Sequence, residues 1–105
     1  MLDINVINTR YFDIKITVKD DDGEEHTVSL NVEPPKLITL KKIIILSKNK
    51  DDEDSMFEMM RLILNKNKTN YKVPNEIIEN LNIDQCKEIF DKYSKWINKN
   101  RQDPN

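Results

Sequence analysis

The chain has 105 residues, which suits one domain with a single modest core. Its composition, 37% hydrophobic and 34% charged, is too apolar for a disordered chain, and its net charge of −2 gives no general attraction for nucleic acid. No apolar run approaches the roughly 20 residues that span a bilayer, the start of the chain is unlike a signal peptide, and the single Cys86 excludes an internal disulfide. We therefore expect a single-domain protein of the cytoplasm that does not associate with membranes.

Residues 10–33 are predicted to form a β-hairpin. Apolar and polar side chains alternate in both halves, as in strands with one buried face, with Phe12, Ile14, Ile16 and Val18 in the first half and His26, Val28, Leu30 and Val32 in the second. Asp22-Gly23 supplies the positive φ that a tight turn requires. Pro34-Pro35 ends the second strand, because proline cannot donate a ladder hydrogen bond. An isolated hairpin is marginally stable in water, so its apolar face must pack on the rest of the chain.

Residues 36–48 are ambiguous between helix and strand. Leu37, Leu40 and Ile44 have helical spacing, but Ile45 and Leu46 fall on other sides of such a helix. The β-branched run over 43–45 favours a strand. We predict a helix here, because a helix would cover the apolar face of the hairpin.

A second helix is predicted over 55–67, with Asp54 or Ser55 as its N-cap. At 100° per residue its apolar side chains spread over roughly 220° of the helix surface, which is wider than the stripe of an ordinary surface helix. Those side chains are Met56, Phe57, Met59, Met60, Leu62, Ile63 and Leu64. Either this helix is central to the fold, or one of its sides meets a partner.

The last part of the chain predicts two further helices. Pro74 follows a polar connector and marks the start of a short helix over 75–81. Asn82 and Gln85 form a variant capping box for a final helix over 83–99. Its apolar stripe has ordinary width and consists of Ile83, Cys86, Ile89, Phe90, Tyr93, Trp96 and Ile97.

The predicted fold class is therefore α+β in a single domain, 1–105. The hairpin over 10–33 packs on a small bundle of three to four helices, and the helical part runs over 36–99. The tail, 100–105, is expected to fray.

No set of residues predicts a catalytic, metal or cofactor site. The only histidine, His26, is predicted to be partly buried at the end of the hairpin, and Cys86 is predicted to be a small core residue of the last helix. The acidic clusters over 20–25 and 51–54 lack the spacing of an EF-hand, so we interpret them as solvated turn residues. An enzyme is the least favoured class.

A small DNA-binding regulator is an alternative hypothesis. The helices over 75–81 and 83–99 follow each other as in a helix-turn-helix, and the second carries Lys87, Lys92, Lys95, Lys99 and Arg101. However, Glu88 and Asp91 share that surface, and Asp84 lies at the start of the helix that would read DNA, where a basic residue is expected.

The remaining features favour contacts with other proteins. Methionines suit core gaps or adaptable binding surfaces, and aromatic residues are frequent interface anchors. The residues predicted to bind partners are Met56, Met59, Met60, Tyr71, Tyr93 and Trp96. The net charge is −5 over residues 1–35 and +4 over residues 36–72, an asymmetry that favours attraction between copies of the chain.

Several segments together carry a family resemblance. The hairpin is followed by a Pro-Pro-Lys-Leu exit at 34–37, a Leu- and Ile-rich segment and the helical stretch 59–68, and then by 73–78, Gln85 and 93–97. This order resembles the tail assembly chaperones of long-tailed phages and prophages of low-G+C Gram-positive bacteria. The resemblance covers roughly residues 10–98.

The resemblance implies a small, mostly helical protein without catalytic residues. Such proteins bind the tape-measure protein before the tail tube polymerises around it, and they self-associate, some of them into spirals. Many are made as a short form and a frameshifted long form, and this chain would be the short form. The predicted function is therefore a tail assembly chaperone in the cytoplasm of a bacterial host, with the tape-measure protein and its own copies as partners. A structural virion protein of the tail or head-completion type is a further alternative.

Overall fold

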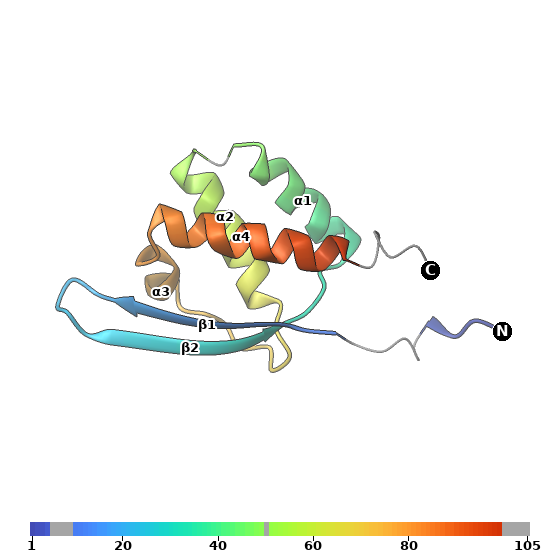
Figure 1. Ribbon diagram of the computed structural model, residues 1–105, viewed down its shortest axis with the longest axis horizontal. Helices are drawn as coiled ribbons and strands as arrows, with labels where there is room; N and C mark the ends of the chain where they lie inside the picture. The colour runs from blue at the N-terminus through green and yellow to red at the C-terminus, as the bar shows by residue number, and fades with distance from the viewer. Residues whose placement is uncertain (5–9, 50, 100–105) are drawn as a thin grey trace.

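The computed structural model describes residues 1–4, 10–49 and 51–99, and it shows an N-terminal hairpin followed by helices (Figure 1). The fold is α+β, as predicted. Strands β1 (Phe12–Lys19) and β2 (Glu25–Val32) pair antiparallel, with Phe12 opposite Val32 and Lys19 opposite Glu25. The apolar side chains on one face are buried, because that face packs on the helices; the most buried are Ile16, Val18, Val28, Leu30 and Val32.

The turn of the hairpin is a three-residue loop. Asp20 and Glu24 flank it: the backbone N–H of Asp20 donates to the carbonyl of Glu24 (2.9 Å), and the N–H of Gly23 donates to the carbonyl of Asp20 (3.0 Å). Gly23 has a φ of +83°, a conformation that glycine adopts without the steric cost that a Cβ brings. The predicted positive φ at Asp22-Gly23 therefore falls on the glycine.

Helix α1 (Leu37–Ser47) confirms the helical prediction for the ambiguous segment, but it does not cover the hairpin. It packs on helix α2 and lies on the side of the molecule away from the strands (Figure 1). The prediction of a lid is wrong, because α2 and the last helix already cover the apolar face of the hairpin. Phe12 of β1, for example, contacts the rings of Tyr93 and Trp96.

Helix α2 (Glu53–Asn65) is the central element of the fold. It packs against α1, the two later helices and β2, which explains why its apolar arc is so wide. Its N-cap is Asp52, two residues before the first predicted candidate. The Asp52 carboxylate accepts hydrogen bonds from the backbone N–H of Ser55 (3.0 Å) and from its hydroxyl (2.7 Å). The helix ends at Asn65 and not at residue 67.

The sequence predicted only a polar connector after α2, but this segment forms backbone hydrogen bonds with β2 and its neighbours. The N–H of Glu33 donates to the carbonyl of Lys66 (2.8 Å), and the N–H of Lys68 donates to the carbonyl of Asn31 (2.9 Å), so this segment runs beside the end of β2. Asn67 is buried there. Its side-chain amide donates to the carbonyls of Leu64 (2.9 Å) and Tyr71 (2.8 Å), and its side-chain oxygen accepts from the N–H of Tyr71 (2.8 Å).

Helices α3 (Asn75–Glu79) and α4 (Ile83–Asn98) agree with the predicted pair except at the end of α3, which is shorter than 75–81. The capping box is confirmed: the Asn82 side chain accepts from the N–H of Gln85 (2.8 Å), and the Gln85 side chain accepts from the N–H of Asn82 (2.9 Å). Ile83, placed on the apolar stripe by the pattern, is exposed because it lies in the first turn, beyond the core. The predicted fraying of 100–105 lies outside the described residues.

Candidate functional site

Helix α1 carries a group of aliphatic side chains that face solvent. Leu37 is 76% exposed, Ile38 66%, Ile44 48% and Ile45 61%. At 100° per residue these four positions fall within an arc of roughly 120° on one side of the helix. We call them the α1 face.

The α1 face exists because α1 is apolar on both of its sides. Ile43 is buried against the rest of the protein, and Leu40 and Leu46 are partly buried on the same side. Within the described ranges 1–4, 10–49 and 51–99, no helix or strand covers the outer side, since α1 packs chiefly on α2. A grouped apolar patch of this kind is typical of a binding surface, whereas isolated exposed apolar residues are common on any protein.

The α1 face is basic as well as aliphatic. At 100° per residue Lys41 falls inside the arc of the face, and Lys42 falls beside it. Helix α1 contains no acidic residue, and Lys36 and Lys48 flank its two ends. All four lysines are exposed. The face therefore combines aliphatic contact area with positive charge, and it suits an apolar surface bordered by acidic groups.

Four of the six residues predicted to bind partners are in the core. Met56 is 4% exposed, Met59 and Met60 are fully buried, and Tyr93 is 2% exposed. Burial also raises the pKa of the Tyr93 hydroxyl far above its usual value. Met59 and Met60 are buried because α2 is central, and Tyr93 is buried because α4 packs on the hairpin, so these side chains have little surface to offer a partner.

The other two predicted residues lie apart from that core group. Trp96 is half-buried: it contacts the ring of Phe12, and the Arg10 guanidinium lies 4.4 Å above its ring. Arg10 also donates to the carbonyl of Trp96 (2.7 Å), so this aromatic group ties the start of the described hairpin segment to the end of α4. Tyr71 is 43% exposed in the segment after α2.

Sequence reasoning missed the α1 face. The pattern grouped Leu37, Leu40 and Ile44 on one side of the helix, but Leu40 is partly buried whereas Leu37 and Ile44 are exposed. It placed Ile45 and Leu46 on other sides, and of these Ile45 is exposed and Leu46 is partly buried. The helical pattern therefore carried no signal for which side faces solvent.

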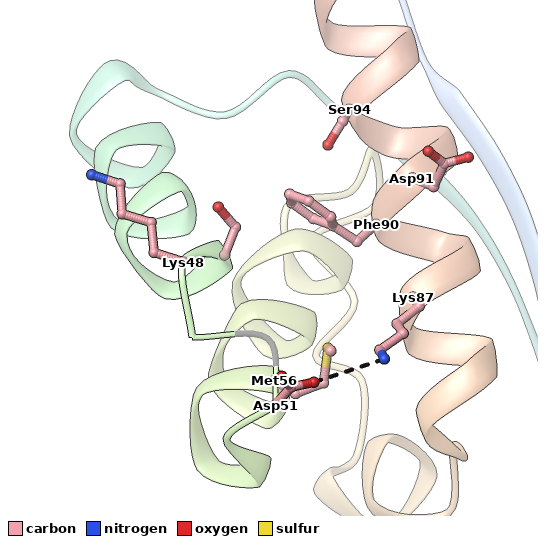
Figure 2. A pocket seen from close by; sticks show the side chains of 8 residues that line it. Lys48, Asp51, Met56, Lys87, Phe90, Asp91 and Ser94 are labelled. Carbon is pink, nitrogen blue, oxygen red and sulfur yellow. Dashed lines mark ion pairs between the residues drawn. The ribbon is translucent and has the colours of Figure 1, made fainter.

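A hollow of about 700 Å³ lies between the end of α1, the start of α2 and α4 (Figure 2). Met56 and Phe90 contribute apolar surface, and Lys87 forms an ion pair with Asp51 across it at 3.9 Å. Its described lining contains no histidine or cysteine, so it offers neither an imidazole base nor a thiol nucleophile.

Three of the lysines considered for DNA binding form ion pairs with acidic residues, and Arg101 lies outside the described residues. Lys92 lies 3.7 Å from Glu88, Lys95 lies 3.1 Å from Asp91, and Lys87 contacts Asp51 as noted above. These pairs lower the positive potential along α4, which weakens the case for phosphate contacts.

Cys86 and His26, the residues whose side chains could act as nucleophile or base, lie where the sequence predicted them. Cys86 is buried in α4, and burial raises the pKa of its thiol, which disfavours the reactive thiolate. His26 lies at the end of the hairpin, with its Nε2 2.9 Å from Oδ2 of Asp20. This hydrogen bond raises the pKa of His26 and lowers the pKa of Asp20.

Comparisons with protein families, characterised proteins and solved structures find no match to this chain. Among the residues that the structure describes, no helix combines the length and the apolar character needed to cross a membrane.

Proposed function

We propose that this protein is an assembly chaperone that binds an apolar helical segment of another protein through the α1 face. The partner that fits the family resemblance is the tape-measure protein of a phage tail, and the compartment is the cytoplasm of a bacterial host. One observation carries the proposal: four exposed aliphatic side chains gather on one side of α1.

The chemistry of the α1 face defines the segment that it would bind. An amphipathic helix docks by placing its own apolar stripe against such a surface, with anchors at helical spacing. The lysines around the face favour a stripe bordered by aspartate or glutamate. A bare apolar stripe on a long helical protein promotes aggregation, and covering it is the work of a chaperone.

One copy of this domain covers a short piece of a long partner. Several copies can bind weakly along the same helix. If neighbouring copies also contact each other, each bound copy raises the effective concentration of the next copy beside it, so that the copies together bind more tightly than one copy does. The opposite net charges of residues 1–35 and 36–72 support contact between neighbouring copies.

The test is a pull-down with a tagged chain from cells that make the complete phage or prophage, with the recovered proteins identified by mass. The wild-type chain should recover a very long helical protein together with untagged copies of itself. An Ile38→Ser, Ile45→Ser double variant should lose the long protein, since both substitutions remove exposed apolar area without entering the core.

Ile83→Ser is the matched control, because Ile83 is an exposed isoleucine on a different helix. This variant should bind as the wild type does. Equal recovery by the double variant would place the binding surface elsewhere. Recovery of DNA that weakens steeply with salt would favour the regulator, and retention of the chain in purified mature particles would favour a structural virion protein.

A further inference from the structure

The end of the hairpin and helix α3 bring together three side chains that can bind a metal ion. His26 offers a ring nitrogen, and Asp20 and Glu76 each offer a carboxylate oxygen; these three atoms lie within 4.8 Å of one another. Asp20 and His26 belong to the hairpin, whereas Glu76 belongs to α3 and comes much later in the chain. Figure 1 shows α3 beside the half of the hairpin that ends in the turn.

The fold prepares the Asp20 carboxylate for such a role. Its Oδ1 accepts hydrogen bonds from the backbone N–H groups of Asp22 and Glu24, both at 2.9 Å. These bonds hold the carboxylate in one orientation and leave Oδ2 directed at His26, at 2.9 Å. Hydrogen bonds that orient a ligating carboxylate are a regular feature of metal sites.

The three atoms also have suitable spacing and charge. Zinc binds imidazole nitrogen and carboxylate oxygen at about 2.0–2.2 Å, so ligand atoms around a tetrahedral ion stand about 3.3 Å apart. The His26–Asp20 pair is 2.9 Å apart and the other pairs are at most 4.8 Å apart, so small side-chain movements can bring the three atoms to that spacing. Glu76 is exposed, so its long side chain can rotate inward, and two carboxylates balance the charge of a divalent ion.

We propose that Asp20, His26 and Glu76 form a site for a divalent transition-metal ion, with zinc as the representative ion. The imidazole ligand favours zinc and similar ions over calcium and magnesium, which prefer all-oxygen sites with more ligands. The bound ion replaces the hydrogen bond between His26 and Asp20 and connects the end of the hairpin to α3. Its remaining coordination positions hold water.

This site escaped sequence reasoning because Glu76 is distant along the chain from the other two ligands. The acidic run over 20–25 was interpreted as solvated, and no spacing motif connects it to residue 76. The proposal is independent of the α1 face and of the chaperone function.

The test is calorimetric titration of the full, tag-free chain with zinc chloride, in a buffer that contains neither phosphate nor chelator. We expect one zinc ion per chain, with a dissociation constant in the micromolar range. Zinc at about ten times that constant should raise Tm by roughly 5–10 °C, since an ion that binds only the folded chain stabilises it.

Two ligand variants and two controls decide the result. His26→Ala and Glu76→Gln should each weaken zinc binding at least about tenfold, and Glu76 is exposed, so that variant keeps the fold. Glu79→Gln on the same helix and Cys86→Ser should bind zinc as the wild type does. Absence of stoichiometric binding, equal binding by Glu76→Gln, equal affinity for calcium, or loss of binding in Cys86→Ser would each overturn the proposal.

Discussion

Helices α1 and α2 pack against each other, and both are rich in apolar residues, yet they have opposite roles. Helix α2 contacts α1, α3, α4 and β2, so its methionines are buried on several sides. Helix α1 packs chiefly on α2, and four of its seven aliphatic residues are exposed. The comparison teaches that apolar residues on both sides of a helix stay exposed where the fold supplies too few neighbours to cover them.

The largest loss of stability is expected when a core side chain of α2 is truncated. Met59→Ala removes a fully buried side chain of α2 and should lower the free energy of unfolding by about 2–5 kcal/mol. Ile45→Ala, on the exposed side of α1, should change it by less than about 0.5 kcal/mol. Urea unfolding followed by circular dichroism measures both values. Similar losses for the two variants would mean that α1 and α2 do not differ in burial as described.

A smaller effect is expected where α2 is joined to β2. Asn67→Ala leaves the carbonyls of Leu64 and Tyr71 without their side-chain donor inside the protein. The free energy of unfolding should fall by about 1–3 kcal/mol, because buried polar groups without partners are costly. Thermal unfolding provides the measurement, and Lys72→Ala is the control, since residue 72 is exposed in the same segment and has no positive φ. Equal Tm values for the two variants would show that the buried amide does not anchor this segment.

The N-caps of α1 and α2 allow two smaller changes in the free energy of unfolding, which are expected to have opposite signs. Asp52 caps α2, so Asp52→Ala should cost about 1 kcal/mol. Lys36 stands at the N-cap of α1 with an extended backbone and no side-chain cap. Lys36→Ser should therefore stabilise the protein by up to about 1 kcal/mol. Chemical unfolding of both variants measures these changes, and a loss in both would show that residue 36 does not act as a helix cap.

The smallest effect on stability should accompany the largest effect on association. The Ile38→Ser, Ile45→Ser double variant should keep the free energy of unfolding within about 1 kcal/mol of the wild type, since both side chains are mostly exposed. It should also lose association with the long helical partner, whereas association between copies, which the opposite net charges of residues 1–35 and 36–72 support, should persist. Sedimentation velocity over a concentration series measures association between copies, and its loss in the double variant would show that the α1 face also contacts other copies.

Much of the fold was predictable because its signals are local. Strand alternation in the hairpin, the positive φ at Gly23 and the capping box of Asn82 and Gln85 each depend on residues close together in the chain. The N-cap of α2 was misplaced by two residues, since several neighbouring acidic residues are all suitable caps. Residues 36–48 were predicted to be helical, but their position in the fold was not.

The sequence by itself determined the hairpin, the order of the three later helices and the apolar stripe through which α4 packs, whereas it left the number of helices open between three and four. Only the tertiary structure decided that α2 is central and that α1 presents an aliphatic face to solvent, because burial depends on which elements meet. The same holds for Asp20, His26 and Glu76, whose ligand atoms come together through contacts between distant segments. Local patterns specify backbone conformation, whereas a site assembled from separate elements exists only after the chain has folded.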